Sequence, residues 1–190
     1  MPVQIGAPAP SFTDPTGLLS DCHRRIEMFL KVLQEVAKIA DRPLADEARQ
    51  SLDTALRYFR EAAPKHTADE EESLFPRLRL MEDPYVALVL SRLEPLEEDH
   101  RRATPLHARV EVLGQQWLKT GSLTPEEAEE FRALVAELAV TYGEHIHVED
   151  NVVFPIAAKL LSWEEKIAIG REMAGRRNVG PPVQLQRSAQ

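Results

Sequence analysis

The sequence predicts an all-α protein, an antiparallel four-helix bundle made of two pseudo-repeated helical hairpins, with a short C-terminal helix added. Three observations support this fold class. Apolar residues recur at helical spacing over four long segments, capping residues and prolines mark the helix starts, and no segment shows the sustained alternation of a strand. Long amphipathic helices with short connections bury their apolar stripes by packing as a bundle.

The first predicted helix begins at Asp14-Pro15 and ends near Asp41. Asp14 can cap the helix, and Pro15 suits the first helical position, where a missing N–H leaves no helical bond unmade. Steps of three and four residues define its inner stripe, which is formed by Leu19, His23, Ile26, Leu30, Leu33 and Ala37. One histidine, His23, is therefore expected to face the core.

The second predicted helix starts near Ala45, and its inner stripe ends in a histidine and a glutamate. The stripe is formed by Leu52, Leu56, Phe59, Ala63, His66 and Glu70. Pro64 lies inside this run, where it removes a backbone donor and its ring clashes with the preceding turn. We expect a kink or a short break there, just before His66.

The third predicted helix opens at Asp83-Pro84 and stops at Gly121. Its inner stripe is formed by Val89, Leu93, Leu96, His100, Ala103, His107 and Val110. Pro95 and Pro105 flank His100, so we expect this helix to bend near that histidine, with a kink or a non-α turn at Pro105.

Two capping boxes open the remaining helices, one at Thr124–Glu127 and one at Ser162–Glu165. The residues of the fourth helix that are expected to face the core are Phe131, Leu134, Leu138, Tyr142, His145, Glu149 and Val152. The fifth ends near Ala174. We therefore divide the chain into an extended lead over 1–13, a bundle with its fifth helix over 14–174, and a flexible tail over 175–190.

The two halves of the chain repeat each other. The segments 66-HTADEEESLFP-76 and 145-HIHVEDNVVFP-155 each have a histidine, a glutamate four residues later, a further acidic residue and then Phe-Pro. A lone histidine, His23 or His100, lies on the helix that precedes each segment. Four of the six histidines thus belong to two copies of one set, and His107 and His147 lie outside both copies.

Residues four apart stack on one helix face, so each His-x-x-x-Glu aims an imidazole and a carboxylate into the same space. A lone core histidine or one exposed His-x-x-x-Glu pair is ordinary, but two matched sets on inward stripes favour a metal site. Buried imidazoles and carboxylates are costly without a cation, and this donor set suits iron, manganese or zinc. The candidate metal ligands are His23, His66, Glu70, His100, His145 and Glu149.

These segments resemble the hemerythrin-like, or HHE cation-binding, domain over about residues 14–160. The resemblance implies a four-helix bundle that holds two non-haem iron ions, bridged by two carboxylates and an oxo or hydroxo group. It carries the same six ligands over and implies that the protein binds a small diatomic ligand, O2 or NO. Manganese and zinc stay open as alternatives to iron.

The chain departs from the oxygen-carrying members of this family at two positions. Thr104 stands where those carriers have a fifth histidine, so we expect an additional open coordination position. Asp150 matches the offset of their last carboxylate, but Glu149 matches Glu70 in the repeat and is preferred. His107 lies two turns, about 10 Å, beyond His100, so it is not expected to bind the same ion, and His147 points to another face.

A ferritin-like di-iron site is the alternative interpretation, because the ligands of such sites include a Glu-x-x-His motif from each of two helices. That spacing occurs at 97–100 and at 144–147. The second of these faces a mostly polar side, and the plan leaves His23 and His66 unused.

Composition limits the function classes. Lys plus Arg is 23 and Asp plus Glu is 31, and the net charge of −8 argues against nucleic-acid or polybasic membrane binding. The single cysteine, Cys22, excludes an internal disulfide framework. No apolar run is long enough for a membrane span, and the N-terminal residues lack a secretory signal pattern, so we expect a cytoplasmic protein.

Three functions stay open at this point. The protein could be a binding or sensing domain for O2 or NO, an iron-centre repair protein or di-iron redox enzyme, or a metal store or structural metal bundle. Whether it is an enzyme, and which protein partner it has, do not follow from the sequence.

Overall fold

The structure, a computed structural model, describes residues 11–180, and within this range it contains helices and turns but no strand. The helices are α1 (Pro15–Ala37), α2 (Asp46–Glu61), α3 (Ala63–Asp69), the π-helix η1 (Glu70–Leu74), α4 (Phe75–Arg79), α5 (Val86–Thr120), α6 (Pro125–Val148), the π-helix η2 (Glu149–Val153), α7 (Phe154–Leu160) and α8 (Trp163–Arg176). The predicted all-α class is confirmed.

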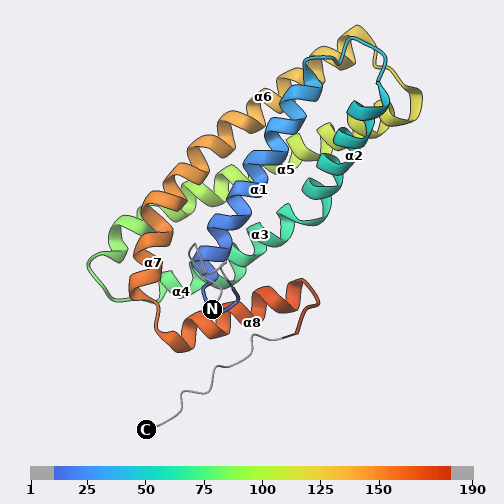
Figure 1. The fold of residues 1–190 in the computed structure, drawn as a ribbon. Helices are drawn as coiled ribbons and strands as arrows, with labels where there is room; N and C mark the ends of the chain where they lie inside the picture. The colour runs from blue at the N-terminus through green and yellow to red at the C-terminus, as the bar shows by residue number, and fades with distance from the viewer. Residues whose placement is uncertain (1–10, 181–190) are drawn as a thin grey trace, which may run out of the picture.

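These elements form four long arms, which are α1, α2 to α4, α5, and α6 to α7 (Figure 1). The first arm packs against α6 and α2, and α5 packs against the same two helices. The short helix α8 lies across one end of the bundle, against α1 and α3 (Figure 1). The predicted four-helix bundle with a short C-terminal helix is therefore present.

The apolar interior is divided into two clusters along the bundle axis. One cluster contains Ile26, Ala63, Ala103 and Ile146, and the other contains Leu19, Leu74, Leu96 and Val153, together with further neighbours of each. On every arm a buried polar stretch separates the two clusters, as His23 does between Leu19 and Ile26 on α1. The buried polar residues thus form a layer across the middle of the core.

The predicted helix starts are confirmed by their caps. The Asp14 side chain accepts a hydrogen bond from the Gly17 N–H at 3.1 Å. Thr124 and Ser162 each form a reciprocal capping box at the start of α6 and α8. Two boundaries differ by a few residues, because α1 ends at Ala37 and α5 begins at Val86.

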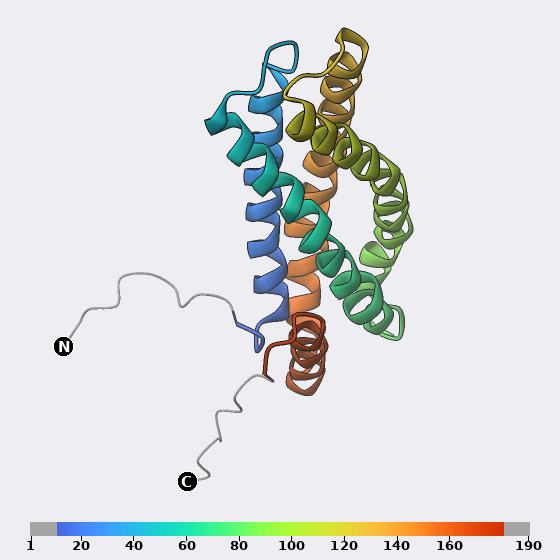
Figure 2. The same ribbon diagram turned by 90° about the vertical axis from the view of Figure 1, so that its right-hand side faces the viewer.

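The prolines inside the predicted helices act differently from one another. The chain breaks at Ala62, between α2 and α3, as expected from Pro64. The expected non-α turn at Pro105 is absent, because α5 runs as one α-helix through Pro95 and Pro105, but the helix is bent, as expected (Figure 2). Figure 2 shows this helix curved over its length, which spreads the strain of the prolines over several turns.

Sequence reasoning missed the two π-helices, one in each half of the repeat. In η1 the Phe75 N–H donates to the Glu70 carbonyl, and in η2 the Phe154 N–H donates to the Glu149 carbonyl, each five residues back. The proline after each phenylalanine has no N–H, so it cannot donate the hydrogen bond to the carbonyl four residues back. A π turn adds one residue to the register, so Val153 is buried in place of the predicted Val152.

The predicted extended lead over 1–13 is only partly described, since residues 1–10 lie outside the described residues. Residues 11–13 are not extended. They form a turn in which the Asp14 N–H donates to the Ser11 carbonyl at 2.7 Å, and Phe12 packs against the core cluster near α8.

The predicted tail over 175–190 also starts later than expected. The last helix, α8, continues through Arg176, and the Val179 N–H still donates to the Ala174 carbonyl. Residues 181–190 lie outside the described residues.

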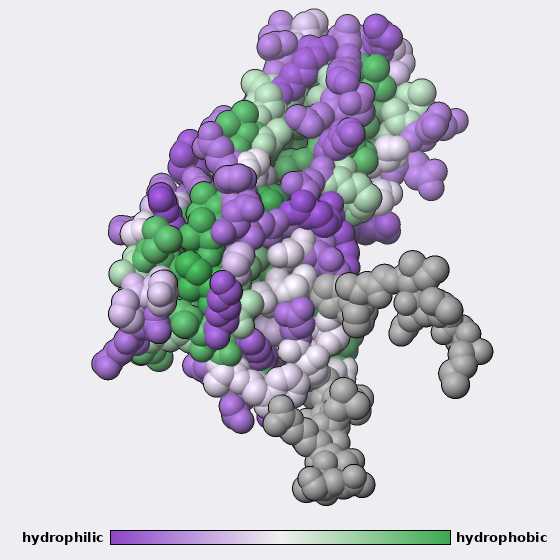
Figure 3. Space-filling model, turned by 60° about the vertical axis from the view of Figure 1, so that its left-hand side comes forward, coloured by the Kyte–Doolittle hydropathy of each residue, from purple (hydrophilic) through white to green (hydrophobic). Residues whose placement is uncertain are grey.

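The molecular surface is mostly hydrophilic on the face in Figure 3, where apolar side chains gather in one patch. Exposed large apolar side chains of the described residues include Leu80, Tyr85 and Leu88. None of the helices within residues 11–180 combines the length and the apolar character that crossing a membrane requires.

The close contact between α8 and the N-terminal turn gives a test of the fold. A Cβ atom on Gly170 would lie 1.7 Å from the backbone oxygen of Phe12, whereas one on Gly143 would meet nothing within 4 Å. We expect Gly170→Ala to lower the free energy of unfolding by about 1 to 3 kcal/mol. Gly143→Ala, the matched control, should raise it by about 0.5 to 1 kcal/mol. Urea denaturation of both variants measures this, and equal effects would contradict the docking of α8.

Candidate metal centre

The six predicted ligand residues come together in the polar layer between the two apolar clusters. All six are buried, with exposed fractions of 0% for His23, 3% for His66, 0% for Glu70, 8% for His100, 3% for His145 and 0% for Glu149. They project from α1, α3, η1, α5, α6 and η2, so every arm of the bundle contributes.

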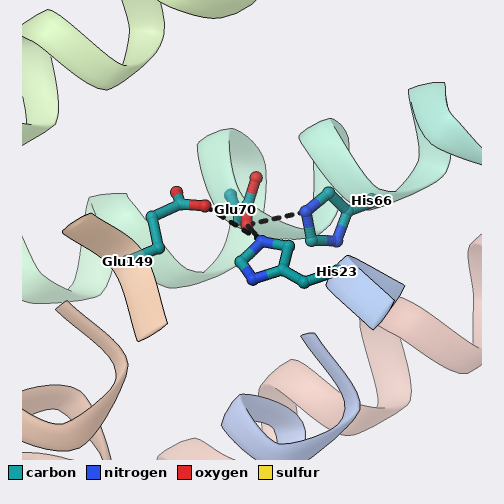
Figure 4. A group of neighbouring side chains, drawn as sticks. All are labelled: His23, His66, Glu70 and Glu149. Atoms are coloured by element: carbon teal, nitrogen blue, oxygen red, sulfur yellow. Dashed lines mark ion pairs between the residues drawn. The ribbon is translucent and has the colours of Figure 1, made fainter. Parts of the chain in front are cut away.

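The first group of possible ligands combines His23 and His66 with the two glutamates (Figure 4). His66 Nε2 lies 3.1 Å from Glu70 Oε1, and His23 Nε2 lies 3.1 Å from Glu149 Oε2 and 3.8 Å from Glu70 Oε1. One ligand atom from each of the four residues lies within 4.8 Å of all the others. This spacing suits ligands that converge on one cation.

The second group combines His100 and His145 with Glu70. His100 Nε2 lies 3.5 Å from Glu70 Oε2, and His145 Nε2 lies 3.1 Å from Glu149 Oε2. Glu70 thus faces the first pair with Oε1 and His100 with Oε2, whereas Oε2 of Glu149 faces one histidine from each pair. The carboxylates lie between two histidine pairs, as two bridging ligands would.

The inner polar atoms of this cluster lack hydrogen-bond partners. Among the described residues, both oxygens of Glu70 and of Glu149, together with Nε2 of His23 and of His145, are buried without a hydrogen bond. Buried polar atoms without partners are costly, and buried carboxylates especially so. A divalent cation would satisfy these atoms, and the nitrogen and oxygen donors fit iron, manganese or zinc.

The pKa values of Glu70 and His23 also indicate that the buried carboxylates lack a positively charged partner. Burial and the neighbouring Glu149 carboxylate raise the pKa of Glu70 well above its ordinary value. Burial acts to lower the pKa of His23, but its hydrogen bond with Asp150 and the nearby negative charges of Glu149 and Glu70 outweigh this and raise that pKa to about 9. Two carboxylates in one apolar site share protons unless a cation lies between them.

A second set of carboxylates contacts the outer nitrogens of the histidines. His23 Nδ1 lies 2.9 Å from Asp150 Oδ1, and His100 Nδ1 lies 2.8 Å from Glu71 Oε1. His145 Nδ1 is 3.5 Å from Asp99 Oδ2, close to this carboxylate but without a hydrogen bond to it. A carboxylate that accepts from the Nδ1–H leaves the lone pair of Nε2 free for a metal, and it fixes the plane of the ring.

The outer carboxylates follow the repeat. Glu71 directly follows Glu70 and holds His100, while Asp150 directly follows Glu149 and holds His23. Each half of the chain therefore orients the lone histidine of the other half. Sequence reasoning noted the acidic residue after each glutamate but did not assign it this role.

The residues that the sequence left undecided lie outside the inner cluster. Asp150 is an outer carboxylate, as described above. His107 Nε2 lies 3.0 Å from the Tyr142 hydroxyl, and the Thr104 hydroxyl donates to the His100 carbonyl at 2.9 Å. His147 is exposed on another face, where its carbonyl accepts from Asn151.

The ferritin-like plan does not match the structure. Glu97 forms an ion pair with Arg79 at 2.7 Å and does not enter the cluster. Glu144 and His147 are both exposed. Of the residues in that plan, only His100 lies in the buried centre.

A cavity of about 300 Å³ adjoins one side of the centre. It reaches His100, and its lining includes Phe59, Ala103, Thr104, His107 and Tyr142. The cavity thus borders the centre at His100, whereas the fully buried His23 is not part of its wall.

Comparisons with known proteins agree with this geometry. The family model described as the hemerythrin HHE cation binding domain matches residues 14–157. A protein of Haemophilus influenzae, described only as uncharacterized, is 25% identical over 171 residues, which cover 89% of this chain and 93% of that protein. The match and the cluster together indicate a metal-binding protein.

Removal of an outer carboxylate should weaken metal binding without removing a ligand. We expect Asp150→Asn and Glu71→Gln each to lower the affinity for Fe²⁺ about 10- to 100-fold, since each releases one histidine ring. Asp53→Asn, an exposed position on α2, is the control. Anaerobic titration with a competing chelator measures the change, and unchanged affinity in both variants would refute the orienting role.

The partly buried ring of His107 gives a pH-dependent test. Burial lowers its pKa from 6.5 to about 4, so the folded protein keeps the ring neutral where the unfolded chain takes up a proton. The stability this ring contributes is complete above pH 6.5 and is lost as the pH falls toward 4.

We therefore expect the unfolding free energy of the metal-free wild type to fall, relative to that of His107→Gln, by up to about 3 kcal/mol over this range. Urea denaturation in the presence of a chelator measures both profiles. Parallel profiles would show that His107 is not buried as a neutral ring.

Proposed function

The chain belongs to the hemerythrin HHE cation-binding family, and on this basis we propose that it is a di-iron protein that binds or senses O2 or NO. One observation carries the proposal. Two histidine pairs, with ring centroids 4.8 Å apart in one and 4.6 Å apart in the other, face the same two buried glutamates. Such a duplicated set of donors suits two metal ions better than one.

The proposed ligands divide between two ions. His23 and His66 would hold one iron, His100 and His145 the other, and Glu70 and Glu149 would bridge them, with an oxo or hydroxo group completing the bridge. Iron is preferred to manganese or zinc because of the family, since the donor set alone suits all three. Bound iron would supply open coordination positions for a small ligand.

The chain's own residues would control how a ligand reaches the centre. The cavity beside His100 would offer an approach to one ion, whereas the fully buried His23, a proposed ligand of the other, does not line it. Thr104 donates its hydroxyl to the backbone and so leaves the position of the missing fifth histidine without a protein ligand. His107 and Tyr142 form a neutral hydrogen-bonded pair in the cavity wall.

The cavity volume favours a second candidate function. About 300 Å³ is far more room than a diatomic molecule fills, and it lies at the lower end of the range for small organic ligands. A di-iron redox or repair enzyme that acts on a larger substrate would use this space. The first proposal is preferred because two polar groups of the lining, Thr104 and His107, already bond to the His100 carbonyl and to the Tyr142 hydroxyl, which leaves fewer polar groups to orient such a substrate.

Metal and gas titrations test the proposal. Protein purified without oxygen should contain about two irons per chain, and NO should change its optical spectrum. Ala103→Leu should slow the association of NO about tenfold or more, because it narrows the cavity beside His100. Ala158→Leu, the same change in a pocket beside Phe154, should leave this rate unchanged.

Protein that takes up no iron would contradict the proposal as a whole. Iron-loaded protein that ignores both gases but reacts with a peroxide would favour the enzyme instead.

A further inference from the structure

We propose that Asp69, clamped by Arg176 at the end of α8 and by Arg177 directly after it, is a positioning residue that sets the geometry of Glu70 and thereby the metal affinity of the centre. The inference rests on the proposed metal site. It assigns a role to α8, which lies beyond the residues matched by the family model.

The clamp consists of one fully buried carboxylate and two guanidinium groups. Arg176 Nη1 lies 3.0 Å from Asp69 Oδ1, and Arg177 Nη2 lies 2.6 Å from Asp69 Oδ2. Asp69 has an exposed fraction of 0%, while the arginine side chains are 19% and 23% exposed. Each oxygen of this carboxylate therefore faces its own arginine, and both arginines come from the end of α8.

Arg176 also reaches into the π-helix that carries Glu70. Its Nη1 donates to Ser73 Oγ at 2.9 Å, and its Nη2 donates to Glu72 Oε2 at 3.1 Å. The side chain thus spans from the residue before η1 to two residues inside it. A π turn is less regular than an α-helix, and contacts from outside the segment can hold it in one conformation.

The internal repeat offers a comparison within the same chain. The positions that correspond to Asp69, Glu72 and Ser73 in the second copy are Val148, Asn151 and Val152. No arginine clamp can form on two valines, and Asn151 instead donates to the carbonyl of His147. The polar residues that Arg176 contacts thus occur only in the copy against which α8 packs (Figure 1).

The position of Asp69 links the clamp to the metal centre. Asp69 is the last residue of α3, and the next residue, Glu70, donates its N–H to the carbonyls of His66 and Thr67. Moving Asp69 would therefore shift Glu70 and the turn that carries His66. Buried ion pairs add little net stability compared with apolar packing, so a role in positioning accounts better for a charge at this place.

Cobalt(II) is a suitable probe, because its visible absorption depends on the number and arrangement of its ligands. The test compares Asp69→Asn, which keeps the shape, with Asp69→Val, which copies the second repeat. Glu172→Gln is the matched control, since it breaks another ion pair of α8, that of Arg77 and Glu172 at 2.7 Å, without contact to Asp69. Arg176→Lys keeps the charge but loses the forked contact.

We expect both Asp69 variants to bind cobalt about tenfold more weakly and with an altered absorption spectrum. Arg176→Lys should fall between these variants and the wild type, and Glu172→Gln should match the wild type. A purely structural role would lower the melting temperature of the metal-free protein but leave the spectrum of the bound cobalt unchanged.

Wild-type affinity and spectrum in Asp69→Asn would overturn the inference while leaving the metal site intact. If the Asp69 variants do not fold, Arg176→Lys tests the inference through the same two measurements, the affinity for cobalt and its absorption spectrum. Failure of the wild type itself to bind cobalt or iron would instead overturn the proposed function, and the inference with it.

Discussion

Two glutamates, Glu70 and Glu149, lie in the middle of an apolar bundle with none of their oxygens hydrogen-bonded among the described residues, and the structure is arranged around them. Their burial divides the core into two clusters and requires four imidazoles at the same level. The cost of this polar layer is large for a protein of 190 residues. The pair of bridged cations that we propose would offset that cost, whereas packing alone would not.

The backbone brings these groups together through the repeat. Each half supplies a π turn whose first residue is a glutamate, and in the Phe-Pro pair after it the proline lacks the N–H that an unbroken α-helix would use. Because the acidic residue after each glutamate orients a histidine of the other half, the two hairpins depend on each other. The two halves are not equivalent, because the centre borders a cavity at His100, whereas α3 and η1 pack against α8.

Sequence periodicity predicted the helices and the six central residues, because buried stripes and His-x-x-x-Glu spacing are local patterns. It could not predict which way Asp150 faces, since that depends on the distance between α1 and η2 in the folded chain. The π turns were missed for a related reason: Phe-Pro was read as a repeat marker and not as a break in register. Arg176 and Arg177 were placed in a loose tail, because their partner Asp69 lies far away in the sequence.

Anomalous diffraction from crystals of the iron-loaded protein tests the central claim most directly, because it locates the ions independently of any assumed ligand. The account predicts two peaks about 3.5 to 4 Å apart. One peak should lie at about 2.0 to 2.2 Å from a nitrogen of His23 and of His66, and the other from His100 and His145. The glutamates should lie between the peaks. A single peak held by Glu144 and His147, or no peak in the buried layer, would contradict the account.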